Sequence, residues 1–232
     1  MSVATIYIGA AVLPALVLMF YVYKKDKIEK ESPRLLIRLI LMGVLAALLS
    51  GVLETGGMAL LNGTVSTYSP LYIPILAIMI GLIEEGTKYA LMKKVTWRNL
   101  EFNFVFDGIV YAAFTSLGFA AFENIGYVLG YGLGVAPTRA LLAIPGHLSF
   151  SVFMGAFYGR AKLYSNYGDE GRSRAARRMG FLIAVAMHAF YDACAMTDST
   201  LSSLIFLAFV VIVDILVILT LRRESRNDRP LW

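Results

Sequence analysis

The sequence predicts an all-α, polytopic membrane helix bundle of about seven transmembrane helices, with its N-terminus outside and its C-terminus in the cytoplasm. Three observations carry this prediction. The composition is 58% hydrophobic and only 16% charged, with a mean hydropathy of +0.69, whereas soluble domains are about 25% charged. The apolar residues form long continuous runs, and the basic residues lie in alternate loops between those runs.

The apolar runs define the expected spans. A helix that rises ~1.5 Å per residue needs about 20 apolar residues to cross a hydrocarbon core of ~30 Å. We expect spans at residues 3–23, 35–61, 71–92, 104–131, 139–163, 179–197 and 200–221. The first run has no basic segment before it and is followed by Lys24 and Lys25, so we expect a retained span rather than a cleaved signal peptide. The whole chain, residues 1–232, is expected to form one transmembrane domain.

The basic residues set the expected orientation. Apart from Lys88 and Arg139, every Lys and Arg lies in or beside the loops that follow the first, third, fifth and seventh spans. The positive-inside rule places these loops in the cytoplasm. Topology therefore explains the net charge of +5, and the sequence contains no module that would bind nucleic acid. We expect a multi-pass protein of the cell membrane, with the lipid bilayer as its surroundings.

Several ionisable residues lie inside the apolar runs. A charged side chain at the bilayer centre costs roughly 2.5–3.5 kcal/mol on insertion scales, so such residues are usually functional. Those of the third to sixth spans lie at similar depths and can converge only if these spans surround one polar cavity. The candidate catalytic residues are Glu84, Glu85, Glu123, His147, His188 and Asp192.

Two spacings predict side-chain pairs within helices. Glu84 and Lys88 are four residues apart, and Glu85 and Lys88 are three apart, so either glutamate can pair with the lysine and leave its neighbour free. His188 and Asp192 are also four apart, which allows the aspartate to orient the imidazole ring. We therefore expect the helices to present pre-paired polar groups to the cavity.

This set of residues predicts the activation of a water molecule, by one of two routes. In the first, Glu123, His147 and His188 bind a Zn²⁺ ion, and Glu84 or Glu85 acts as the base on the bound water. In the second, no metal takes part: one of the two glutamates activates water and a histidine stabilises the oxyanion. The sequence has no HExxH motif and leaves both routes open.

Other polar residues are expected to be structural. Glu54 and Asp214 lie in the second and seventh spans, and we expect structural roles for both, with substrate gating as the alternative. Asp107 and Arg139 are expected to anchor their spans near opposite membrane faces. Pro145, which lies just before His147, is expected to bend or loosen the start of its span.

Four motifs resemble those of a known family. The third span contains EEGTK, and the fourth contains FDGIVYAAFTSLGFAAFENIGYV. The fifth contains RALLAIPGHLSFSVFMGAFYGRAK, and the sixth contains HAFYD. In this order and spacing, the motifs resemble the PrsW family of membrane-embedded bacterial proteases, which is related to the CAAX prenyl proteases.

The resemblance implies an intramembrane peptidase whose catalytic helices span about residues 71–197. It implies that Glu84 and Glu85 are catalytic, and that the substrate is a single-pass anti-sigma factor cut at site 1. Glu123 stands where the CAAX relatives have a histidine. The resemblance leaves the metallo- and glutamic types both open. A proton-coupled transporter and a non-catalytic scaffold are the alternatives from other functional classes.

Overall fold

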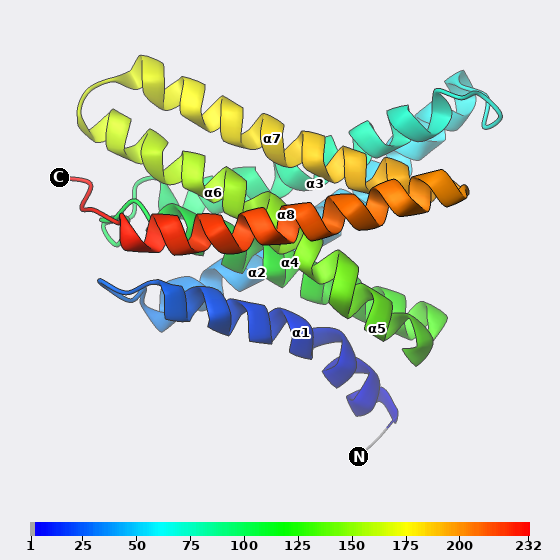
Figure 1. The fold of residues 1–232 in the computed structure, drawn as a ribbon, viewed down its shortest axis with the longest axis horizontal. Helices are drawn as coiled ribbons and strands as arrows, with labels where there is room; N and C mark the ends of the chain where they lie inside the picture. The colour runs from blue at the N-terminus through cyan, green and yellow to red at the C-terminus, as the bar shows by residue number, and fades with distance from the viewer. Residues whose placement is uncertain (1–2) are drawn as a thin grey trace.

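The computed structural model describes residues 3–232, and seven long α-helices make up most of them (Figure 1). In chain order, the described elements are α1 (Val3–Lys25), α2 (Pro33–Thr64), α3 (Tyr72–Thr96), α4 (Asp107–Tyr131), η1 (Leu133–Val135), α5 (Ala136–Thr138), η2 (Arg139–Ala143), α6 (Ile144–Asn166), α7 (Glu170–Met196) and α8 (Thr200–Arg226). The predicted all-α bundle is therefore confirmed.

Six of the membrane-length segments in the described chain are long and apolar enough to cross a bilayer. The remaining long helix, α3, has 25 residues but carries Glu84, Glu85 and Lys88 at its middle. The predicted span boundaries differ most for α7, which begins at Glu170 rather than at residue 179. Its first turns are polar and are capped by the side chain of Asp169, so this helix extends beyond its apolar segment.

Helix α4 lies at the centre of the bundle and packs against α1, α2 and α6. Its contact with α6 depends on small residues: a Cβ added to Gly155 would lie 2.5 Å from the backbone oxygen of Gly108. Without a hydrophobic driving force between helices in lipid, such close backbone contact is a main source of packing energy. Helix α3 packs between α2 and α7, and α8 packs across α6 and α7.

The loops that follow α1 and α3 and the tail after α8 meet at one end of the bundle, which we call the basic end because the basic loops lie there (Figure 1). Here the tail pairs with the segment before α4: Leu231 N donates to Asn103 O at 2.8 Å, and Val105 N donates to Arg229 O at 3.1 Å. The positive-inside rule predicts that the basic end is cytoplasmic.

The opposite end contains an irregular segment before α6. Residues Arg139–Ala143 form a π-helix directly before Ile144 and Pro145. Proline has no N–H to donate to the preceding turn, so the regular α-helical hydrogen bonding cannot continue through it. The expected loosening at Pro145 is thus present, and π-helical turns are often found at functional sites.

Candidate active site

Four helices bring the predicted site residues together. A cavity of about 140 Å³ is lined by residues of α2, α3, α4, η2, α6 and α7. Its lining includes five of the six candidate catalytic residues, namely Glu84, Glu123, His147, His188 and Asp192. The sixth, Glu85, is fully buried directly behind the cavity. The expected convergence of the third to sixth spans is therefore present.

Lys88 is the cation at the centre of this group. Its Nζ atom lies 3.0 Å from Glu84 Oε2 and 2.8 Å from Glu85 Oε1. The same Nζ lies 3.2 Å from His147 Nδ1 and 4.0 Å from the centre of the Phe119 ring. The expectation that Lys88 would neutralise one glutamate and leave the other free differs from the structure, because the lysine reaches both carboxylates.

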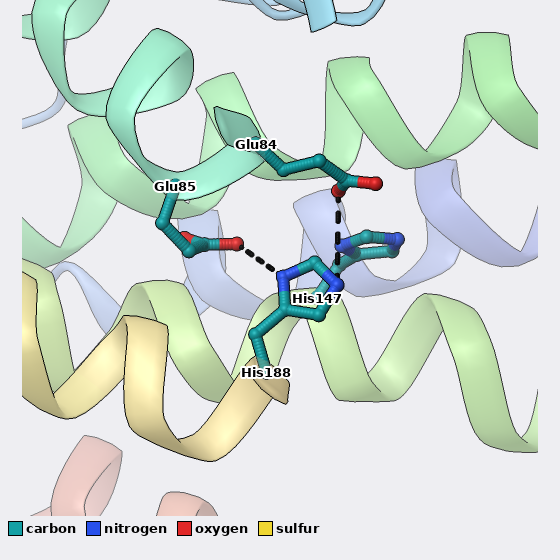
Figure 2. Close-up of side chains that lie close together, drawn as sticks. All are labelled: Glu84, Glu85, His147 and His188. Carbon is teal, nitrogen blue, oxygen red and sulfur yellow. Dashed lines mark hydrogen bonds and ion pairs between the residues drawn. The ribbon is translucent and has the colours of Figure 1, made fainter. Parts of the chain in front are cut away.

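His188 lies between carboxylates on both sides of its ring (Figure 2). Its Nδ1 is 2.9 Å from Glu85 Oε1, and its Nε2 is 3.4 Å from Asp192 Oδ2 and 3.8 Å from Glu84 Oε2. A carboxylate on Nδ1 fixes the orientation of the ring and directs Nε2 toward the cavity. The predicted pairing of His188 with Asp192 is present, and Glu85 adds a second partner.

The contacts of His147 define its tautomer. An ammonium can only donate, so Nδ1 of His147 must accept from Lys88. The proton of a neutral ring then lies on Nε2, which is 3.2 Å from Glu123 Oε2. The backbone of His147 is held as well, because Ser116 Oγ donates to its carbonyl oxygen at 2.9 Å. His147 therefore directs a lone pair toward the group around Lys88.

Arg139 is a member of the site that sequence reasoning missed. It was expected to be an interfacial anchor, but its Nη2 lies 2.6 Å from Glu123 Oε2 and its Nε lies 2.8 Å from Asn124 Oδ1. Its guanidinium also lies 3.6 Å from the centre of the Tyr127 ring. The π-helix η2 presents Arg139 to the cavity. The signal in the sequence was a lone arginine at the end of the bundle that otherwise has almost no basic residues.

The two remaining acids of the apolar runs have different surroundings. Glu54 lines the cavity, and its Oε1 is buried without a hydrogen-bond partner among the described residues. Asp214 lies outside this cavity and accepts a hydrogen bond from Ser149 Oγ at 3.2 Å. Asp107, the other expected anchor, is buried and accepts from the backbone N–H groups of Asn103 and Phe104. The contacts of Asp214 and Asp107 are those of structural residues.

A group of four side chains has the geometry to hold a metal ion. One potential ligand atom from each of Glu84, Glu85, His147 and His188 lies within 4.8 Å of the other three, and all four side chains are buried. Glutamate oxygen and histidine nitrogen are ligands that zinc accepts. Glu123, the predicted ligand, is not a member of this group, and its Oε2 atom contacts Arg139 and His147 instead.

The fold and the site together define a class: a polytopic membrane protein with a buried carboxylate–histidine centre open to a small polar cavity. Residues 31–220 match the family described as PrsW family intramembrane metalloprotease. The chain belongs to this family.

Curated relatives agree with the match. Protease PrsW of Oceanobacillus iheyensis is 32% identical over 220 residues, which cover 95% of this chain and 96% of the relative. Protease PrsW of Geobacillus kaustophilus is 35% identical over 185 residues, 80% of this chain and 77% of the relative. Protease PrsW of Bacillus subtilis is 30% identical over 189 residues, 80% of each chain. No solved structure matches the chain.

These relationships confirm the predicted resemblance and a membrane peptidase of the multi-pass type. The bacterial relatives imply a location in the cell membrane. Membership of a protease family favours the peptidase over the transporter and the scaffold, the two alternatives that the sequence alone had left.

Proposed function

We propose that the protein hydrolyses a peptide bond of a single-pass membrane protein inside the polar cavity, with Glu84 as the base that activates water. One observation carries the proposal: of the two adjacent glutamates, Glu84 lines the cavity, whereas Glu85 is fully buried and does not. The sequence had left the choice between Glu84 and Glu85 open. The cavity of about 140 Å³ is large enough for several water molecules.

The chemistry follows from the position of each group. Glu84 takes a proton from water as the water oxygen attacks the scissile carbonyl carbon, and negative charge develops on the carbonyl oxygen. Arg139 lines the cavity and stabilises that charge, as fixed cations do in oxyanion sites. Glu84 then returns the proton to the amide nitrogen as the C–N bond breaks. The products are a new carboxylate and a new amine.

The other residues of the site position these groups. Glu85 holds the ring of His188 through Nδ1, and Asp192 contacts its other nitrogen. Glu123 joins Arg139 to His147, so a shift of either side chain would move the other. Lys88 holds both adjacent carboxylates and keeps their charge compensated inside the bundle.

The donors around Lys88 also fit a metal ion, as the family description implies. Three of the four potential ligands already hold a cation, the ammonium of Lys88. We propose that His147, His188 and Glu85 would bind the ion, which forms a His₂Glu set typical of catalytic zinc and leaves Glu84 as the base. A bound metal lowers the pKa of its water and polarises the scissile carbonyl. This ligand set replaces Glu123 of the sequence prediction with Glu85.

A second cavity supports an entry path for the substrate. A groove of about 560 Å³ adjoins the polar cavity and shares Tyr127, Arg139, Tyr191 and Asp192 with it. Its walls come from η2, the C-terminal turns of α7 and the first turns of α8, away from the basic end. We propose that an unwound segment of the substrate occupies this groove. The predicted topology then places cleavage on the extracytoplasmic side.

The substrate that we propose is a single-pass anti-sigma factor cut at site 1, on the strength of the PrsW resemblance. The test is to co-express such a protein with the wild type and with the Glu84→Ala, Glu85→Ala double variant, and to map the product ends by mass spectrometry. We expect cleavage near the extracytoplasmic end of the substrate span by the wild type and none by the double variant. Full cleavage by a well-inserted double variant would contradict the proposal.

A further inference from the structure

A basic groove lies between α3 and α7 toward the basic end, and it shares no lining residue with the polar cavity described above. Two adjoining hollows of about 420 Å³ and 630 Å³ share Tyr89, Lys93 and Arg177. We call them together the α3–α7 groove, defined by Tyr89, Lys93 and Trp97 on one wall and by Arg174, Arg177 and Arg178 on the other. Both volumes fall in the ~300–1,000 Å³ range of small-molecule sites.

Helices α3 and α7 are in close backbone contact near the middle of α3, and the groove lies farther along both helices, toward the basic end. At the contact, a Cβ added to Gly81 would lie 3.1 Å from Val185 O and 3.3 Å from Ala189 N. The Glu85–His188 hydrogen bond lies one turn farther along α3. Toward the basic end the two helices still meet through side chains, since the ring centres of Tyr89 and Phe181 lie 5.9 Å apart.

The positive charge of the groove is largely uncompensated. Among the described residues, the ion pair of Arg177 Nη2 with Glu170 Oε2 is long, at 3.9 Å. Lys93, Arg174 and Arg178 have no carboxylate within ion-pair distance in the described chain. Arg177 lies 4.5 Å from the centre of the Trp97 ring, which holds its guanidinium at the groove wall. The groove therefore selects an anion.

Both walls continue into surface that faces lipid. On α3, the positions Leu82, Gly86, Tyr89 and Lys93 follow one helix face, because they are spaced by four, three and four residues. Leu82 is 45% exposed and lies toward the middle of the helix, whereas Lys93 lies in its last turn. The face runs from apolar to basic along the helix.

Helix α7 repeats the pattern in the opposite chain direction. Arg174, Arg178 and Leu182 are spaced by four residues and share one face. The exposed Leu182 lies toward the middle of this helix, and the arginines lie nearer its start. A ligand that matches both walls has an anionic group at the basic end and apolar chains that extend toward the bilayer centre.

We propose that the α3–α7 groove binds the head group of an anionic phospholipid, with its phosphodiester among Lys93, Arg174 and Arg178 and its acyl chains along Leu82 and Leu182. Basic pockets between transmembrane helices suit such head groups. The bound lipid would join the two helices that carry Glu84, Glu85 and His188. A free phosphate or an acidic peptide would satisfy the cations but would leave the apolar part of both walls uncovered.

The test uses the full-length protein in nanodiscs of phosphatidylglycerol or of phosphatidylcholine, with retained lipid measured by native mass spectrometry. The groove variant is Lys93→Gln, Arg174→Gln, Arg178→Gln. Its matched control is Arg223→Gln, Arg226→Gln, Arg229→Gln, which removes the same charge from exposed positions at the same end. We expect the groove variant to retain about tenfold less phosphatidylglycerol, and the control to retain as much as the wild type.

Three results would overturn the proposal: equal loss in both triple variants, equal retention of phosphatidylcholine by the wild type, or saturation by inorganic phosphate that abolishes lipid retention. Displacement of the lipid by a soluble acidic peptide would instead assign the groove to a protein segment, and would also overturn it. If the groove variant does not fold, the proposal is tested by crosslinking the wild-type protein with a photoactivatable phosphatidylglycerol. It should label peptides of α3 and α7 together, and labelling elsewhere alone would contradict the proposal.

Discussion

Two groups of buried and partly buried acids differ in the partners that hold them. At the centre, Glu84 and Glu85 share the ammonium of Lys88 and face the rings of His147 and His188. At the basic end, acidic side chains lie near one another and accept hydrogen bonds from backbone N–H groups. Those bonds run from Phe104 to Asp107, from Phe106 to Asp228 and from Ser32 to Glu101.

The difference in partners indicates that the central group serves catalysis and that the acids of the basic end serve structure. Backbone N–H donors hold a carboxylate against a loop, and they do not exchange a proton or a metal ion with it. The acids of the basic end therefore hold the interhelical loops and the tail in place. Side-chain partners in the central group can give or take protons or a metal ion, and they surround a polar cavity that is large enough for water. A substitution in the central group should therefore affect activity most, and one at the basic end should affect stability most.

The largest expected effect is that of Lys88→Met. This change removes the ammonium that both buried carboxylates contact, and the loss of one partner of a buried ion pair costs about 3–5 kcal/mol. We expect no cleavage and a clear loss of stability in unfolding measured in detergent. Lys27→Met, at an exposed position of the loop after α1, is the control and should change neither property. A stable, active Lys88→Met protein would show that the central group needs no fixed cation.

Removal of metal tests whether the central group of glutamates and histidines binds a divalent ion in addition to the ammonium of Lys88. We expect about one divalent ion per chain by elemental analysis, none in the His147→Ala, His188→Ala variant, and chelator-sensitive cleavage. Cleavage that resists chelation, in protein shown to be free of metal, would contradict the proposed ligand set. The ammonium of Lys88 would then be the only cation on which Glu84 and Glu85 depend.

Arg139→Lys should have the next largest effect. A lysine cannot contact both Glu123 and Asn124 with the geometry of a guanidinium. We expect kcat to fall about 100-fold, the scale of losing one oxyanion donor, with little change in KM. Arg160→Lys is a matched control, because Arg160 pairs with Glu224 away from the cavity. A rise in KM alone would make Arg139 a substrate-binding residue instead.

The smallest effect concerns pH and the basic end. Burial raises the pKa of Asp26 to about 6, and burial together with the nearby carboxylate of Asp107 raises the pKa of Glu31. A carboxyl group whose pKa is higher in the folded state than in the unfolded chain favours folding most at pH values below its ordinary pKa, which is near 4 for both residues. This contribution to stability is lost as the pH rises through the folded-state pKa. For Asp26 the loss falls between about pH 4 and pH 6 and is at most about 3 kcal/mol.

Asp26→Asn should therefore flatten the dependence of the unfolding free energy on pH over that range. Asp169→Asn, at a half-buried helix cap on the same end, is the comparison. A stability that rises with pH over the same interval in the wild type would contradict the assignment.

The sequence was sufficient for the spans and for most of the site, because ionisable residues such as Glu85 and His188 stand out in apolar runs. It could not separate Glu84 from Glu85, since which of two adjacent residues faces a cavity depends on how α3 is rotated against its neighbours. Arg139 was missed for a related reason. Its position near a membrane face is equally suited to an anchor, and only the π-helix before Pro145 presents it to Glu123.

The central claim is that Glu84 performs the chemistry because it is the member of the pair that faces the cavity. The most direct measurement is the cleavage rate of Glu84→Gln beside that of Asp214→Asn, each at matched amounts in the membrane. Both changes remove one acid from an apolar helix, but Asp214 lies outside the polar cavity. We predict that Glu84→Gln is slower by about 10²–10⁴-fold, the contribution of a general base, and that Asp214→Asn retains wild-type activity. Equal rates for Glu84→Gln and Asp214→Asn would contradict the account.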